Sequence, residues 1–227
     1  MAVLPRPPSR HVRRHGEAVS PLSSAAPTRD VDATEGFGQP TRKHIAAMLV
    51  DISGYVAFAE TIEPEILFAM LRDFHGLIGR VVEEHGGTVI NFVADTSLMI
   101  FDGPLATPDP ELRAVRAAIA LRERFDELAI AWNKQGFDLD LRIGLHAGFA
   151  TVGLIGYPGR LELGVIGRTV NTTVRIAGQA KPGQTLASER FLAAVDERLE
   201  VGAFSEVALR GLARPLKIAE ILRRRGA

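Results

Sequence analysis

The chain has 227 residues in which 27 basic and 27 acidic side chains balance, and it contains no cysteine. A net charge of zero gives no support for nucleic-acid binding, which normally goes with a strongly basic balance. The lack of cysteine excludes a disulfide framework, a thiol nucleophile and a thiolate metal site, and it fits a reducing compartment such as the cytoplasm. The longest unbroken apolar run, Ile45–Val50, is far shorter than the ~20 residues of a membrane-spanning helix, so we expect a soluble protein without membrane insertion.

Composition changes near residue 43. Residues 1–43 hold six of the 13 prolines and a single aromatic residue, Phe37, and their apolar residues follow neither a helical nor a strand period. Such a segment cannot bury enough apolar surface to offset its backbone entropy. The sequence therefore predicts a disordered Pro/Arg/Ser-rich arm over residues 1–43 and one folded domain over residues 44–227.

The first half of this domain begins with a buried strand, Ile45–Val50. Pro64 then suits the first turn of a helix, whose apolar residues recur every three or four positions up to Gly86. Thr88–Phe92 and Ser97–Phe101 follow as two short strands of a hairpin, with an acidic residue at its tip.

In the second half, Asp109 and Pro110 begin another amphipathic helix. Strands are predicted at Leu139–Gly148 and Ala150–Gly156, a helix from about Thr169, and a short helix after Ser188; two final strands are expected at Glu206–Leu209 and Lys217–Leu222. Hairpins mixed with long helices favour an α+β fold in which helices cover one face of a mostly antiparallel sheet.

Two acidic residues stand out by position. Asp51 ends the first strand and Asp95 lies at the hairpin tip, with no basic residue between Glu83 and Phe101. If the two strands are neighbours, both carboxylates meet at one end of the sheet without a local neutralising charge. Such a pair suits Mg²⁺, which takes one or two carboxylates together with substrate phosphates, but it equally suits a general acid and base.

Asn171 and Arg175 are four residues apart and project from one face of the predicted helix. An amide beside a guanidinium can donate hydrogen bonds to a phosphate and to an adjacent oxygen, although a solvated polar face has the same pattern. The sequence contains no P-loop, dinucleotide fingerprint or nucleophile elbow, and its histidines lack metal-ligand spacing.

Taken together, four segments resemble the catalytic domain of class III adenylate and guanylate cyclases: Ala47–Tyr55, Gly87–Asp95, Leu141–Gly148 and Val165–Asn171, with Arg175 four residues further on. They occur in the family's order and span almost all of residues 44–227. The resemblance implies a ferredoxin-like βαββαβ core with added strands, working as a head-to-tail homodimer.

The resemblance also implies a role for each motif residue. Asp51 and Asp95, with the Ile52 carbonyl, would hold two divalent cations, Mg²⁺ or Mn²⁺, and Asn171 and Arg175 from the opposite subunit would orient the ribose and neutralise the α-phosphate. The phosphates would be bound by the backbone of Ser53, Gly54 and Tyr55 and by the side chains of Arg142 and Arg210. The product would be a 3′,5′-cyclic nucleotide, with pyrophosphate released.

The base-reading positions depart from the family pattern. Asn91 stands where adenylate cyclases usually have Lys, and Gly164 where they have Asp or Thr; guanylate cyclases commonly use Glu and a small polar residue. The amide of Asn91 can both donate and accept, and Gly164 leaves space for water. We therefore expect ATP as substrate with weak base discrimination. GTP use, or a non-catalytic nucleotide-binding regulatory module, are the alternatives.

Overall fold

The computed structural model describes residues 39–101, 108–134, 136–195, 199–209 and 214–224. The predicted N-terminal arm, apart from its last few residues, and Arg210 lie outside these ranges. The elements in chain order are β1 (Thr41–Ser53), α1 (Tyr55–Ala59), α2 (Pro64–Glu84), β2 (Gly87–Val93), β3 (Thr96–Phe101), α3 (Pro110–Asn133), β4 (Asp140–Tyr157), β5 (Arg160–Ile166), α4 (Arg168–Ala177), β6 (Thr185–Ser188), α5 (Glu189–Leu192), β7 (Leu199–Val201), β8 (Ser205–Val207) and β9 (Leu216–Arg224).

The strands form a mixed sheet in the order β2-β3-β1-β4-β6-β9-β7, in which β5 pairs with β4 and β8 with β9. All pairs are antiparallel except β4 with β6. The stretch β1-α2-β2-β3-α3-β4, with spatial order β2-β3-β1-β4, is the βαββαβ core that was expected. The α+β class with a mostly antiparallel sheet is thus confirmed.

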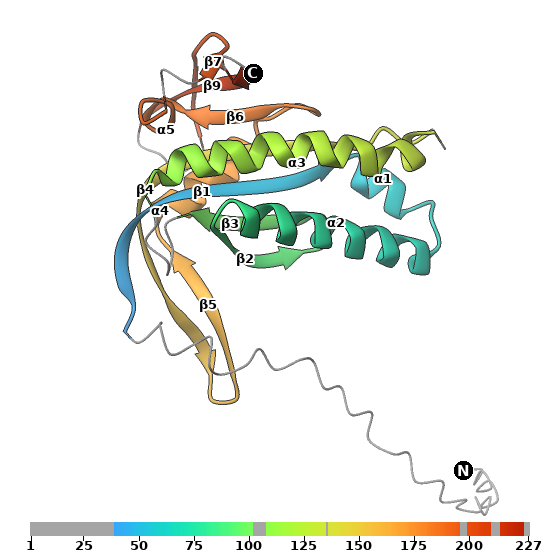
Figure 1. Cartoon of the computed structure of the whole chain (residues 1–227), viewed down its shortest axis with the longest axis horizontal. Helices are drawn as coiled ribbons and strands as arrows, with labels where there is room; N and C mark the ends of the chain where they lie inside the picture. The colour runs from blue at the N-terminus through green and yellow to red at the C-terminus, as the bar shows by residue number, and fades with distance from the viewer. Residues whose placement is uncertain (1–38, 102–107, 135, 196–198, 210–213, 225–227) are drawn as a thin grey trace, which may run out of the picture. The chain divides into compact units, whose positions relative to one another are not determined.

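The main core lies between the sheet and helices α2 and α3, which run side by side over one face (Figure 1). Alternate residues of β1 face these helices, as a strand's two-residue period requires. These residues are Ala46, Met48, Val50 and Ile52, and they pack with Phe74, Ile78 and Val81 of α2, Leu121 and Phe125 of α3, and the same face of β4. The helical apolar stripe predicted from the sequence therefore forms the core.

Helix α4 lies on the opposite face of the sheet, which corrects the expectation that helices cover one face only. A side chain at Gly144 of β4 would place its Cβ 2.4 Å from the backbone nitrogen of Ala177, and one at Gly148 would meet the Thr169 hydroxyl at 2.8 Å. Glycines therefore give α4 a surface on which its backbone can approach the sheet closely.

Strand β4 is continuous over Asp140–Tyr157, whereas the sequence predicted two strands separated near Phe149. Its first part pairs with β1 as far as the Thr41–Val152 partners, and its last part pairs with β5. The hairpin turn lies instead at Pro158 and Gly159, a turn signal that the prediction did not use. The same register shows that β1 begins at Thr41, before residue 44. No helix in the described ranges is long and apolar enough to cross a membrane.

Candidate functional site

Three polar side chains form a row across β3, β1 and β4. The antiparallel registers pair Asp51 with Thr96 on one side and with Arg142 on the other. Thr96 Oγ1 donates to Asp51 Oδ1 at 3.0 Å, and a guanidinium NH₂ group of Arg142 donates to Asp51 Oδ2. The sequence showed no basic residue near the two acids along the chain, but sheet register brings Arg142 to Asp51 from a distant strand, so Asp51 does have a neutralising partner.

Asp95 lies beside this row, in the turn between β2 and β3. The backbone N–H of Ile52 donates to the carbonyl of Asp95 at 3.3 Å, which ties the turn to the end of β1. Burial raises the pKa of Asp95 to about 6, and the negative charge of Asp51 adds to this rise, while a backbone hydrogen bond and Arg142 oppose it. Asp51 and Asp95 therefore lie close enough for their charges to interact, as the sequence predicted.

This pair has the donor set of a shared cation site. Across the described ranges no group of three or more His, Asp or Glu residues could hold a metal by itself. Two carboxylates without further protein ligands fit Mg²⁺ or Mn²⁺, which keep open positions for water or phosphate oxygens. A carboxyl group whose pKa is raised by burial and by a like charge is also one that a bound cation would restore to its ionised form.

The segment after Asp51 turns sharply into the short helix α1. Gly54 has φ 83°, and a Cβ there would lie 2.6 Å from the carbonyl oxygen of Asp138. A residue with a side chain would be strained in this conformation and would also clash. Burial, and next the charge of Asp95, raise the pKa of the Tyr55 hydroxyl, so this hydroxyl stays protonated beside the acidic pair. Ser53, Gly54 and Tyr55 thus border the same end of the sheet.

Asn171 and Arg175 project from α4 without a side-chain hydrogen bond or ion pair to any residue that the structure describes. Asn171 is exposed, Arg175 is partly exposed, and the apolar Val174 between them is 45% exposed. No hydrogen bond or ion pair joins these two side chains to Asp51 or Asp95. One chain therefore carries both groups of predicted site residues without a direct bond between them.

The two predicted base-reading positions lie on β2 and β5, which do not pair with each other but lie close to one another. Ile90 of β2 and Val165 of β5 pack against the same small apolar cluster as Ile45. Asn91 is exposed, but a Cβ at Gly164 would lie 2.5 Å from Cγ2 of Ile155. The space that Gly164 was expected to leave for water is thus filled by Ile155 in the side-chain direction, which leaves Asn91 as the polar group of this pair.

One hydrogen-bond donor of the Arg142 guanidinium is unpaired. Its Nε is buried and has no hydrogen-bond partner in the described part of the chain, although a terminal nitrogen binds Asp51. A buried donor without a partner costs free energy, so the guanidinium is stabilised if an anion binds there.

Sequence reasoning missed Thr96 as a site residue. The one signal for it was that Thr96 directly follows Asp95 in the β2–β3 hairpin. Only the strand register connects it to Asp51.

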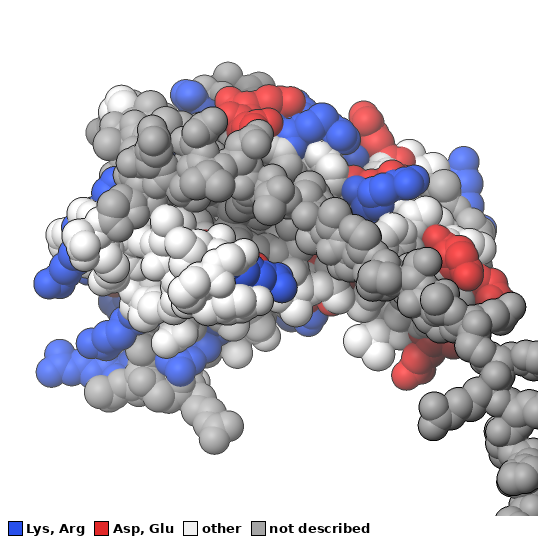
Figure 2. Space-filling view, turned by 90° about the horizontal axis from the view of Figure 1, so that it is seen from below, with Lys and Arg blue, Asp and Glu red and all other residues white. Residues whose placement is uncertain are grey.

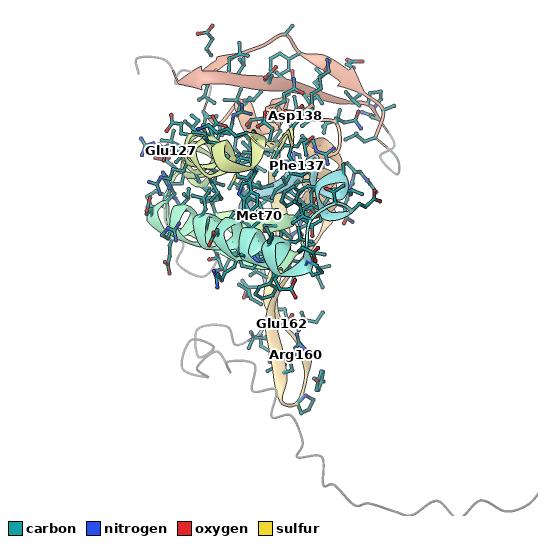
Figure 3. All side chains as sticks on the ribbon, turned by 90° about the vertical axis from the view of Figure 1, so that its right-hand side faces the viewer. Met70, Glu127, Phe137, Asp138, Arg160 and Glu162 are labelled. Atoms are coloured by element: carbon teal, nitrogen blue, oxygen red, sulfur yellow. The ribbon has the colours of Figure 1, made fainter. Side chains whose placement is uncertain are left out.

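The hairpin of β4 and β5 exposes apolar side chains. β4 and β5 extend beyond Thr41, the N-terminal end of β1 (Figure 1), and end near the exposed Arg160–Glu162 ion pair (Figure 3). Large exposed apolar side chains line it: Phe149, Ile155, Tyr157, Leu161 and Ile166, each more than half exposed. Seen from the end toward which the hairpin extends, an uncharged area lies between basic side chains (Figure 2). Exposed apolar area of this kind is typical of protein–protein contacts.

Comparison with known proteins agrees with this geometry. A family model described as "Adenylate and Guanylate cyclase catalytic domain" matches residues 38–220. "Adenylate cyclase 1" of Rhizobium meliloti (strain 1021) is 30% identical over 184 residues, which are 80% of this chain and 28% of that protein. The chain thus spans less than a third of the length of this relative.

Two solved structures are similar over most of the chain. The adenylyl cyclase CyaB from P. aeruginosa is 27% identical, with a TM-score of 0.79 over 83% of this chain and 98% of that one. The guanylyl cyclase Cya2 is 29% identical, with a TM-score of 0.77 over 81% of this chain and 94% of that one. Both kinds of cyclase are therefore similar to this chain to nearly the same degree.

Proposed function

Since this chain belongs to the adenylate and guanylate cyclase catalytic domain family, we propose that it converts ATP to 3′,5′-cyclic AMP and pyrophosphate, with GTP as a competing substrate. The observation that carries the proposal is the Asp51–Asp95 pair. Two acidic residues meet at the end of β1, one of them with its pKa raised to about 6, beside an arginine that has an unpaired buried donor. This combination suits a cation and a polyphosphate that bind together.

Asp51, Asp95 and the Ile52 carbonyl would hold two divalent cations, Mg²⁺ or Mn²⁺. When bound, such ions make the ribose 3′-hydroxyl more acidic and neutralise the triphosphate. The residues of the chain do the rest. Arg142 would exchange its bond to Asp51 for one to a phosphate oxygen, and the backbone at Ser53, Gly54 and Tyr55 would border the phosphates. Arg210, outside the described ranges, is proposed as a further phosphate ligand.

In the reaction, the ribose 3′-hydroxyl gives its proton to solvent water, and the 3′-oxygen attacks the α-phosphorus. A bond forms between that oxygen and phosphorus, and the bond from the α-phosphorus to the bridging oxygen of the β-phosphate breaks. Asn171 would hold the ribose so that the 3′-oxygen approaches in line, and Arg175 would neutralise the negative charge that grows on the α-phosphate oxygens. Donors positioned in advance for developing charge are commonly the largest contribution to catalysis.

We infer that two copies of the chain form the active site together. Within the described part of their own chain, Asn171 and Arg175 make no side-chain hydrogen bond or ion pair, with Asp51 and Asp95 or with any other residue. In a head-to-tail dimer each chain can supply Asp51 and Asp95 to one site and Asn171 and Arg175 to the other. The exposed apolar side chains of the β4–β5 hairpin offer the surface that such an assembly would bury.

A complementation assay tests this arrangement. Asp51→Ala and Arg175→Ala should each be inactive alone with ATP or GTP and either Mg²⁺ or Mn²⁺. Mixed in equal amounts, they should recover about a quarter of the wild-type rate, because half of the dimers are mixed and each holds one intact site. No recovery from variants that remain folded and dimeric would contradict a shared site. Product formed by either variant alone would contradict the proposed roles of these residues.

Base selection should be weak. Asn91 can meet adenine or guanine because an amide rotates to present a donor or an acceptor, and Gly164 adds no side chain. A site in which the wrong base leaves few polar groups without a hydrogen bond discriminates weakly between bases. We therefore expect the kcat/KM values for ATP and GTP to differ by less than about a hundredfold, or ~2.7 kcal/mol. Gly164→Thr should sharpen selection for ATP only when combined with Ile155→Ala, since Ile155 fills the Cβ direction of residue 164.

A further inference from the structure

His75 of α2 contacts the hairpin that carries Asp95. Its ring stacks on Phe92, with the centroids 4.2 Å apart and the planes 27° from parallel. Its Nε2 lies 2.8 Å from the carbonyl oxygen of Ala94. Since a carbonyl can only accept, Nε2 carries the proton and donates. A helix of the main core therefore reaches both the last part of β2 and the turn after it.

This part of the hairpin has little support from the sheet. β2 is an edge strand, and its register with β3 shifts between Val89 and Asn91. The side chains from Asn91 to Ala94 are exposed. Ala94 also has φ 49°, a left-handed conformation that costs free energy for a residue with a side chain. Without additional contacts, the turn could relax and carry Asp95 with it.

Hydrogen bonds hold the peptide units on both sides of Asp95. The carbonyl of Ala94, which precedes Asp95, accepts from His75, and the carbonyl of Asp95 accepts from the Ile52 N–H at 3.3 Å. Fixing both flanking peptide planes fixes φ and ψ of Asp95, and thereby the direction in which its carboxylate leaves the backbone. One anchor comes from α2 and the other from the end of β1.

We propose that His75 is a positioning residue that holds the Asp95 carboxylate in the orientation in which it binds a divalent cation. The inference rests on the proposed function, since it takes Asp95 as a ligand of that cation. Residues that orient a ligand typically change metal affinity 10- to 100-fold when they are replaced. A histidine that only fills space would change stability without changing metal affinity in proportion.

Two substitutions separate the hydrogen bond from the packing. His75→Phe keeps a ring that can stack on Phe92 but has no donor, and His75→Gln keeps a donor near the position of Nε2. Mn²⁺ binding by the full chain, measured by calorimetry without nucleotide, should weaken about tenfold or more in His75→Phe and stay within about threefold of wild type in His75→Gln. His85→Phe is the matched control, because the His85 ring, just after the end of α2, bonds to the carbonyl of Val81 in that helix and its loss should leave Mn²⁺ binding unchanged.

A second measurement does not depend on metal or activity. Amide hydrogen exchange across residues 91–96 of the metal-free protein should be faster in His75→Phe than in wild type, and close to wild type in His75→Gln. Unchanged exchange or unchanged Mn²⁺ affinity in His75→Phe would overturn the proposal, as would a His75→Gln variant impaired to the same extent. A wild-type protein that binds Mn²⁺ in this His75-dependent way but forms no cyclic product would contradict the proposed function and leave the positioning role standing.

Discussion

The guanidinium of Arg142 and the carboxylate of Asp51 form an ion pair between β4 and β1, although 91 positions separate them in the chain. Thr96 occupies the other oxygen of the same carboxylate. A cation can therefore bind the Asp51 carboxylate without competition only if the ion pair between Arg142 and Asp51 breaks. Metal binding and release of the arginine toward a phosphate would then be parts of the same event.

Arg142→Gln should separate the effect of Arg142 on metal binding from its effect on phosphate binding. Without the competing guanidinium, Mn²⁺ affinity in the absence of nucleotide should rise roughly fivefold, which corresponds to about 1 kcal/mol for a partly exposed ion pair. The KM for the triphosphate should rise at the same time, because a charged hydrogen bond to phosphate is lost. Calorimetry and steady-state kinetics measure the two quantities.

The control is Arg124→Gln, which removes an exposed ion pair with Glu84 on the helical face. It should change neither quantity. Weaker Mn²⁺ binding by Arg142→Gln would show that Arg142 supports the metal site rather than competing for it.

Asp95→Asn should stabilise the metal-free protein at alkaline pH. Folding raises the pKa of Asp95 from 3.8 to about 6, so the stability associated with the protonated form is present below 3.8 and is lost as the pH rises through 6. Asparagine cannot ionise and avoids this loss. Because the residue is partly exposed and solvent screens its charge, we expect a gain on the order of 1 kcal/mol at pH 8 and almost none at pH 4.

Denaturant unfolding in EDTA at the two pH values measures this gain. Asp126→Asn replaces an exposed carboxylate of α3 and should show no such pH dependence. The Asp95→Asn variant should also lose cyclase activity. An equal or larger gain in stability at pH 4 would show that the negative charge of Asp95 is not what destabilises the metal-free protein.

Gly144→Ala should destabilise the fold and displace α4. The added Cβ would lie 2.4 Å from the backbone of Ala177, so either the helix or the strand must move, and overpacking of this kind costs about 1–3 kcal/mol. Activity should fall by more than the loss of folded protein explains, because α4 carries Asn171 and Arg175.

Gly79→Ala is the matched control for this substitution. Gly79 lies within α2, and a Cβ there meets nothing within 4 Å, so alanine should stabilise by up to ~1 kcal/mol through helix propensity. Thermal unfolding and kcat at saturating metal provide the comparison. Full activity in a stable Gly144→Ala variant would mean that close packing of α4 is not needed.

The apolar hairpin should determine assembly. Replacing Ile155 and Leu161 together by Ser removes two side chains that are each 54% exposed, and should raise the dimer dissociation constant roughly tenfold through lost apolar burial. Sedimentation over a range of concentrations, with nucleotide present, measures this. Ile130→Ser, at an exposed position of α3, should have no effect. A wild-type chain that stays monomeric at every concentration, with and without nucleotide, would contradict the proposal that two chains share each site.

Helices α2 and α3 and the β2–β3 hairpin were predictable because local periodicity and turn residues encode them. Phe74, Ile78 and Val81 follow the helical period and are buried in α2. The break predicted near Phe149 was wrong for a physical reason: Gly148 resembles a strand end in sequence, but the structure uses its missing side chain to admit α4. A glycine that makes room for packing and one that ends an element cannot be told apart along the chain.

By itself, the sequence determined the order β1-α2-β2-β3-α3, the placement of Asp51 and Asp95 at strand ends, and the spacing of Asn171 and Arg175 on a single helix, because short-range patterns and turn chemistry specify these features. It missed α1, β5, β6 and β7. Only the tertiary structure decided that Arg142 and Thr96 bind Asp51, that His75 reaches the Asp95 turn, and that Asn171 and Arg175 make no hydrogen bond or ion pair with the two acids. Those contacts depend on strand register and on close packing between residues far apart in the chain, which no local pattern encodes.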